Sequence, residues 1–196
     1  MAGSREHRES GEAPDGGSGL TPAPPRTQDV RAALVEVGAS VRRYLFGMCG
    51  DWHRAEDLAQ EALLKAWRKR ESFNGRSDVK TWVFAIARNH WVDSLRRRAS
   101  GPREEPMIQE SPANGSSGPR AAAERAELSA AVRGAVEKLP AEQREALSLR
   151  ESRGLTFRQI AELLGVPAAT VKSRVRYALL KLADELEPFR DWEPRS

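Results

Sequence analysis

Apolar residues recur along this 196-residue chain at intervals of three and four, which is the spacing of amphipathic helices. In the first half this pattern predicts helices over residues 30–47, 55–70 and 77–98. In the second half it predicts a helix containing residues 128–139, helices over 140–151 and 156–164, and a last helix that begins at Pro167. Neither half contains a long segment in which β-branched residues alternate with polar ones, the pattern of a β-strand, so we expect an all-α fold.

Two segments poor in large apolar residues divide these helices into two groups. Residues 1–28 contain a single leucine, and residues 100–120 contain three Gly, four Pro and four Ser. Such segments bury too little apolar surface to offset the entropy of ordering. We therefore predict a disordered N-terminal extension over 1–28 and a flexible linker over 100–121. Two small helical domains, at 29–99 and 122–188, are expected on either side of the linker, followed by a tail at 189–196.

The predicted helix over 77–98 carries apolar residues on two sides, which is typical of a buried helix. Ser77 is a candidate N-cap for it, and the spacing of Trp82 with its apolar neighbours favours a core position. The helix nevertheless ends in three consecutive arginines, Arg96–Arg98. This end must therefore reach solvent or an anionic partner.

The second half has the layout of a helix-turn-helix. Gly154 is expected at the end of one helix, Thr156 and Gln159 form a capping box for the next, and Gly165 allows a tight turn. Residues 168–182 then contain four basic residues and no acidic one. Such a helix fits the major groove of DNA. The alternative interpretation is a basic, solvated helix in an ordinary bundle.

Charge and composition narrow the classes of function. Residues 30–98 contain fourteen basic and eight acidic residues, and residues 122–190 contain twelve basic and ten acidic residues. Both candidate domains therefore carry a net positive charge, as phosphate-binding modules often do. With one cysteine, Cys49, and three scattered histidines, we expect no metal site and no cofactor. No apolar run predicts a membrane span or a secretion signal, so we expect a cytoplasmic protein. An enzyme acting on nucleic acid is disfavoured, because no catalytic constellation is visible.

Several long motifs resemble the sigma-70 superfamily of RNA polymerase sigma factors, and most closely its extracytoplasmic-function (ECF) group. In the first half these are residues 55–67 (AEDLAQEALLKAW), 73–77 (FNGRS), 80–89 (KTWVFAIARN) and 93–98 (DSLRRR), which resemble conserved region 2. In the second half they are residues 139–146 (LPAEQREA), 154–167 (GLTFRQIAELLGVP) and 170–174 (TVKSR), which resemble region 4. Both sets occur in the order of the family.

The resemblance implies an alternative sigma factor that binds core RNA polymerase, recognises the −35 and −10 promoter elements and promotes promoter opening, without catalysis of its own. It implies that Asp57, Gln60 and Glu61 contact the clamp helices of the largest polymerase subunit, and that region 4 contacts the flap. For the −10 element, as single-stranded DNA with an extruded base, the matching residues are Arg76, Arg88, Asn89, Arg96, Arg97 and Arg98. For the −35 element they are Lys172, Ser173, Arg174 and Arg176, with Arg174 on phosphate.

The resemblance also implies that the free protein either occludes its own DNA-binding surfaces or is held by an anti-sigma factor. In the linker, Glu104, Glu105 and Glu110 either imitate the charge of RNA or belong to a passive spacer, and both alternatives remain open. His90 and Trp91 lie at positions that vary in the family and receive no role. A stand-alone helix-turn-helix regulator, whose first half would dimerise or act as a sensor, is the main alternative function.

Overall fold

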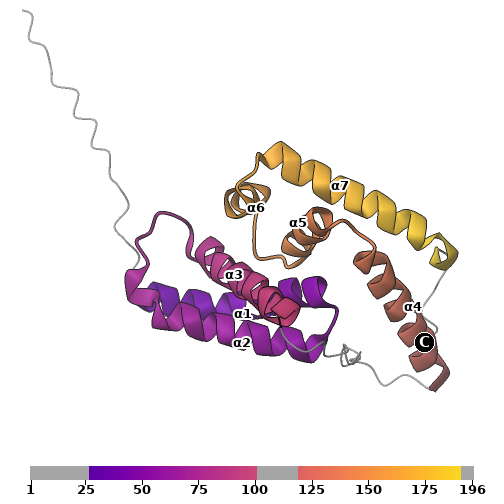
Figure 1. Cartoon of the computed structure of the whole chain (residues 1–196), viewed down its shortest axis with the longest axis horizontal. Coiled ribbons are helices and arrows are strands. Elements are labelled where there is room, and N and C mark those ends of the chain that lie inside the picture. Colours follow the sequence, from indigo (N-terminus) through magenta and orange to yellow (C-terminus); the bar gives the residue numbers. More distant parts are fainter. Residues whose placement is uncertain (1–26, 101–118, 191–196) are drawn as a thin grey trace, which may run out of the picture.

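The computed structural model describes residues 27–100 and 119–190. In the first half, α1 (Thr27–Cys49) and α2 (Trp52–Arg68) run side by side, and α3 (Val79–Ser100) packs against both (Figure 1). A single 3-10 turn, η1 (Arg70–Ser72), follows α2. These three helices correspond to the three predicted from the apolar spacing, with ends shifted by a few residues.

The second half contains α4 (Pro119–Glu137), α5 (Ala141–Glu151), α6 (Phe157–Leu164) and α7 (Ala168–Glu185), with a 3-10 turn, η2 (Glu187–Phe189), after them. The long α7 lies across α5 and contacts α4 and α6 (Figure 1). All secondary structure in the described ranges is helical, and the prediction of an all-α chain is confirmed. Most of the predicted extension, linker and tail lies outside the described residues. At their edges, residues 27–28 of the predicted extension belong to α1, residues 119–121 of the predicted linker belong to α4, and residue 189 of the predicted tail belongs to η2.

Local side-chain caps determine where α2, α3 and α6 begin. The Asp51 side chain accepts a hydrogen bond from the Arg54 backbone N–H and caps α2. Thr156 and Gln159 form the predicted capping box of α6. The predicted cap at Ser77 is not the one used: Asp78 Oδ1 accepts from the Lys80 N–H at 2.8 Å, and α3 begins one residue later. A carboxylate is the stronger acceptor for the positive end of a helix.

The hydrophobic core is continuous between the two halves. Tyr44 of α1 and Phe84 of α3 are fully buried, with ring centroids 5.8 Å apart. From the second half, Leu149 of α5 and Ile160 of α6 are also fully buried in the same cluster. Burial of each such side chain contributes about 1.5–3 kcal/mol. The two predicted domains therefore pack against each other, through α1 on α5 and α3 on α6.

This packing explains the two apolar sides of α3. One side faces α1 and α2, and the second half covers part of the other. Trp82 is half-buried against the core, 5.0 Å from the Phe73 ring, in agreement with its expected core position. The outer end of the helix is uncovered, and Leu95 is 45% exposed.

Two expectations for the second half are corrected. The helical spacing of apolar residues in the last helix predicts that Leu179 shares a buried face with Val171 and Val175. Leu179 is instead 50% exposed, because the buried face of α7 uses Val171, Val175 and Ala178. We also expected Gly154 to be the left-handed residue after α5. That conformation belongs to Arg153, with φ 59°, whereas Gly154 allows a close contact between the two halves.

In the part of the chain that the structure describes, none of the helices combines the length and apolar character needed to cross a bilayer.

Candidate nucleic-acid and protein interfaces

The helices α6 and α7 form a helix-turn-helix. The chain leaves α6 through Gly165, whose φ of 66° is left-handed, a backbone conformation that glycine adopts without steric cost. Ala161 of α6 and Val171 of α7 are both buried where the two helices pack together. The α6 capping box and the packing of α7 on α5 hold the second helix of the motif in place. The motif predicted from sequence is therefore present, with its expected turn.

The outward face of α7 carries three of the four residues predicted for the −35 element. Lys172, Ser173 and Arg176 are exposed, and none of them forms an ion pair among the interactions of the described residues. The fourth, Arg174, is half-buried and forms an ion pair with Glu142 of α5. Ser173 donates to the Ala169 carbonyl oxygen and Lys172 lies over the Phe157 ring, but all three side chains remain exposed to a ligand, whereas Arg174 is engaged by a carboxylate within the protein.

The acidic face of α2, which we define as Asp57, Gln60 and Glu61, is also exposed. These residues share the side of the helix opposite the buried residues Leu58 and Ala62, which pack in the core. The amphipathic pattern of α2 therefore presents two carboxylates and an amide to solvent on a rigid helix. This arrangement can contact a cationic protein surface.

The residues predicted for the −10 element do not form one cluster. Arg76 precedes α3, and the arginines Arg96–Arg98 lie in its last turns, and all of them are exposed. Asn89 is exposed in the middle of α3. Its neighbour Arg88 points toward the second half and forms an ion pair with Glu145. The structure thus separates Arg88 from the other members of the predicted site.

Arg88 forms the central contact between the halves. Its Nε donates to Glu145 Oε1 at 2.8 Å and its Nη2 donates to Glu145 Oε2 at 3.2 Å. The buried Tyr44 hydroxyl donates to the same Oε1 at 3.3 Å. We call Arg88, Glu145 and Tyr44 the interdomain contact. The hydrogen bonds that Arg88 donates to Glu145 raise the pKa of Arg88, while burial and then the charge of Glu145 raise the pKa of Tyr44 well above its ordinary value. Arg88 is therefore charged and Tyr44 neutral at physiological pH.

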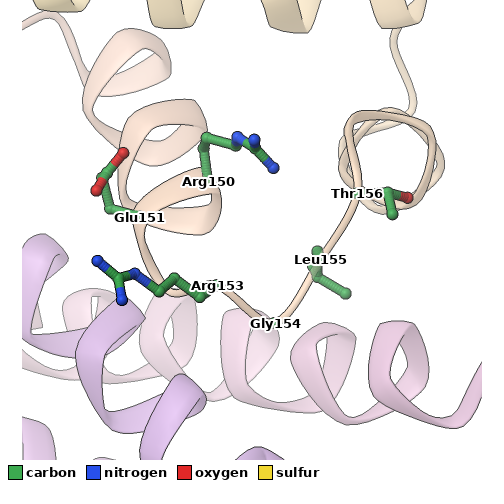
Figure 2. Close-up of a pocket in the computed structure, with 6 residues that line it drawn as sticks. All are labelled: Arg150, Glu151, Arg153, Gly154, Leu155 and Thr156. Carbon is green, nitrogen blue, oxygen red and sulfur yellow. The ribbon is translucent and has the colours of Figure 1, made fainter.

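The turn between α5 and α6 is the second point of contact (Figure 2). Arg43 of α1 donates from Nη2 to the Ser152 carbonyl oxygen at 3.0 Å. Gly154 lies so close to α3 that a Cβ atom there would stand 2.8 Å from Phe84 Cε2. Figure 2 shows this glycine directly above α3, with the Arg150 side chain directed into the space between α5 and α6. The α5–α6 turn is therefore seated on the first half.

Sequence reasoning missed Glu145, Tyr44 and His90. Glu145 lies in a quoted motif, but nothing in the spacing connects it to Arg88, 57 residues away. His90 is a polar residue within an apolar stripe of its helix, and it is 2% exposed. That pattern of one polar residue in an otherwise buried stripe was the available signal. The described ranges hold no group of three or more His, Cys, Asp or Glu side chains that could bind a metal ion.

The fold and these surfaces define a class of protein. A helix-turn-helix with an exposed basic helix binds duplex DNA, and a separate helical unit with acidic and basic faces provides surfaces for further partners. A DNA-binding transcription factor with two helical modules fits this description.

Comparison with known proteins identifies the family. Residues 34–101 match the model of Sigma-70 region 2, and residues 129–182 match the model of Sigma-70 region 4. The chain is 32% identical over 159 residues to the ECF RNA polymerase sigma factor EcfG of Rhodopseudomonas palustris, covering 81% of this chain and 86% of that protein. It is 30% identical over 172 residues to the ECF sigma factor SigW of Bacillus subtilis, covering 81% and 91%.

Among solved structures, the chain resembles the sigma factor RpoE of Bartonella quintana, which was crystallised with the anti-sigma factor NepR. The TM-score is 0.64 at 29% identity, covering 83% of this chain and 99% of that one. The protein therefore belongs to the sigma-70 family, in its ECF group. It is an alternative sigma factor, a transcription initiation factor for RNA polymerase and promoter DNA, and this family is not a known class of enzyme.

Proposed function

We propose that this sigma factor binds the clamp helices of core RNA polymerase through the acidic face of α2 and recognises −35 DNA through the outward face of α7. The assignment of α7 to −35 DNA rests on one observation: Lys172, Ser173 and Arg176 are exposed together on this helix. The helix is held in place by α6, which has a capping box at its start and a glycine turn at its end. Lysine or arginine on guanine is the commonest specific contact in the major groove. Region 4 would also contact the flap. The protein has no catalytic activity of its own and acts in the cytoplasm with the polymerase.

The −10 element is assigned to Arg76, Asn89 and the arginines Arg96–Arg98, with Arg88 joining them only after a conformational change. Arg88 pairs with Glu145 in the described arrangement, so a phosphate or base can reach its guanidinium only if that ion pair breaks. This supports a resting state in which the second half occludes part of the −10 surface. Binding of both halves to polymerase would separate them and release Arg88.

Control by an anti-sigma factor is part of the proposal. Its support is the solved relative from Bartonella quintana, which is bound to the anti-sigma factor NepR. A partner that holds the two halves together stabilises the state in which Arg88 is engaged, and so opposes binding to polymerase and promoter.

The polymerase-binding assignment is tested by charge reversal. The double variant Asp57→Lys and Glu61→Lys should lose at least tenfold in affinity for purified core enzyme. The introduced lysines would repel the cationic surface that we propose for the clamp helices. The helical circular dichroism of the variant should stay unchanged, since both side chains are exposed. The matched control is Asp184→Lys and Glu187→Lys, which makes the same charge change at exposed positions near the end of the second half. Equal affinities for the two variants would contradict the assignment.

Transcription with purified core enzyme tests the function as a whole. The full chain should direct initiation at a native promoter, and the Lys172→Ala and Arg176→Ala variants should lose it in a way that depends on the −35 sequence. A stand-alone regulator would instead bind a palindromic duplex without polymerase and direct no initiation.

A further inference from the structure

A buried histidine connects α3 to the acidic face of α2. His90 has a side chain that is 1% exposed, and it lies between Glu61 and Lys65, which are one turn apart on α2. Its Nδ1 is 2.6 Å from Lys65 Nζ, and its Nε2 is 2.8 Å from Glu61 Oε2. The ring thus contacts a cation with one nitrogen and a carboxylate with the other.

The chemistry of these partners determines where the ring proton lies. A lysine ammonium has hydrogens to donate and no lone pair, so Nδ1 must accept from Lys65. The proton of the neutral ring is therefore on Nε2, which lies 2.8 Å from Glu61 Oε2 in a close electrostatic contact that does not have the geometry of a hydrogen bond. Burial, and then the charges of Lys65 and Arg97, lower the pKa of His90, while Glu61 opposes this effect. The ring is accordingly neutral at physiological pH, with a defined tautomer.

This arrangement affects what Glu61 can do. A glutamate followed four residues later by a lysine on a helix normally forms a direct ion pair. No such pair joins Glu61 and Lys65 in the described part of the chain, because each reaches the imidazole instead. The Glu61 side chain keeps 60% of its surface exposed, although one of its oxygens lies against the ring. Its carboxylate is thus held at the helix surface without being neutralised by a lysine.

We propose that His90 is a positioning residue for polymerase binding: it holds one oxygen of Glu61, engages Lys65, and so leaves the carboxylate oriented toward a cationic surface on the polymerase. The inference rests on the proposed function of the acidic face of α2. Without the imidazole, Glu61 and Lys65 can pair directly, and the carboxylate then has to exchange that partner for the polymerase. The binding surface would lose its preorganisation, although α2 itself would remain helical.

Two substitutions separate hydrogen bonding from packing. His90→Gln retains an acceptor for Lys65 and an N–H for Glu61, whereas His90→Met fills similar space with neither. We expect His90→Met to weaken binding to core polymerase about five- to tenfold, the effect of misplacing one polar contact. His90→Gln should stay within about threefold of the parent. If His90 were purely structural, His90→Met would bind core polymerase as tightly as His90→Gln or more tightly, because methionine is the better core residue.

The free protein provides a test that does not depend on polymerase. The ¹⁵N spectrum of His90 should show protonation at Nε2, and its shifts should change in both Glu61→Gln and Lys65→Met. A proton on Nδ1, or shifts indifferent to both substitutions, would overturn the assigned contacts of the ring with Lys65 and Glu61.

A double-mutant cycle distinguishes failure of this inference from failure of the proposed function. Glu61→Gln alone should weaken core binding, and adding His90→Met to it should cause little further loss. If Glu61→Gln leaves the affinity unchanged, the acidic face of α2 is wrongly assigned. If Glu61→Gln weakens binding while His90→Met does not, or if the two losses multiply, the positioning role of His90 is wrong and the acidic face stands.

Discussion

The interdomain contact predicts that a substitution can destabilise this protein and yet improve its binding to polymerase. In Glu145→Gln, the side chain keeps its shape and a hydrogen bond to Tyr44, but it loses the charge that holds Arg88. The resting arrangement of the two halves becomes weaker. If polymerase binds only the separated arrangement, the variant starts closer to the binding-competent state.

The magnitude follows from the geometry. The two hydrogen bonds are 2.8 and 3.2 Å long, and opposite charges at such a distance attract by roughly 5 kcal/mol at an effective dielectric constant of about 20. Desolvation offsets most of this attraction. The side chains of Arg88 and Glu145 are 33% and 15% exposed, so solvent screens the pair further. A net contribution of about 1–2 kcal/mol remains, which corresponds to a change of about 5- to 30-fold in the equilibrium between closed and separated halves.

Two measurements with opposite expected signs test this reasoning. The melting temperature of Glu145→Gln should fall, because the closed state loses an ion pair. Its apparent dissociation constant for core polymerase should also fall, by about 5- to 30-fold if the parent is mostly closed. The matched control is Glu142→Gln. Glu142 lies on the same helix, α5, but its ion pair is with Arg174 of α7, so it joins two helices of the second half and does not join the two halves. Glu142→Gln should lower the stability without tightening core binding.

The reasoning is refuted if Glu145→Gln binds core no more tightly than Glu142→Gln does. Spin labels on exposed sites of the two halves, Val35 and Leu180, in a Cys49→Ser background, provide an independent check. Their distance distribution should broaden to longer values in Glu145→Gln. An unchanged distribution together with tighter binding would mean that the effect does not arise from separation of the halves.

The remaining predictions concern the turn that joins α5 to α6 and the single cysteine. Gly154→Ala should destabilise the protein by about 1–3 kcal/mol, because the new Cβ would lie 2.8 Å from the buried ring of Phe84. The neighbouring Arg153→Gly should stabilise the protein by up to about 1 kcal/mol, because glycine adopts the left-handed φ of 59° without steric cost. Denaturant titration measures both, and equal destabilisation by the two substitutions would contradict this account of the turn. Cys49 should react slowly with alkylating reagents, since burial raises the pKa of its thiol from 9.0 to about 11. Below pH 9 the folded chain should react about 100-fold more slowly than the unfolded chain. Because the folded pKa is the higher one, this thiol's contribution to stability is complete below pH 9 and declines as the pH rises from 9 to 11. Equal alkylation rates for the folded and unfolded chains at pH 8 would show that the thiol is not protected.

Much of the candidate site could be predicted because its signals are local. The spacing of Leu58 and Ala62 determines which face of α2 is buried, and so which face presents Asp57 and Glu61. The capping box at Thr156 and the turn at Gly165 define the ends of α6 and the start of α7 within a few residues. Each of these features depends on residues within about four positions of one another, where hydrogen bonds and side-chain contacts follow the helical repeat.

The errors occurred where a residue had more than one possible local partner or a partner far away in the chain. At the start of α3, Ser77 and Asp78 are both acceptable caps, and the carboxylate is the one used. Gly154 looked like a helix C-terminus, because glycine is common there. In the folded protein the restriction at Gly154 is steric and comes from Phe84, 70 positions earlier, so Arg153 adopts the left-handed conformation instead.

The sequence by itself determined the helices, the exposed acidic face of α2 and the helix-turn-helix, because all of these follow from periodicity, capping and turn chemistry. Only the tertiary structure decided that the two halves pack together, that Arg88 is held by Glu145, and that His90 lies between Glu61 and Lys65. The contacts of His90 and Arg88 join residues 25 to 57 positions apart, and the contact between Tyr44 and Glu145 joins residues 101 positions apart. At such separations no periodic signal survives, and the pairing depends on which buried polar groups find partners once the helices have packed.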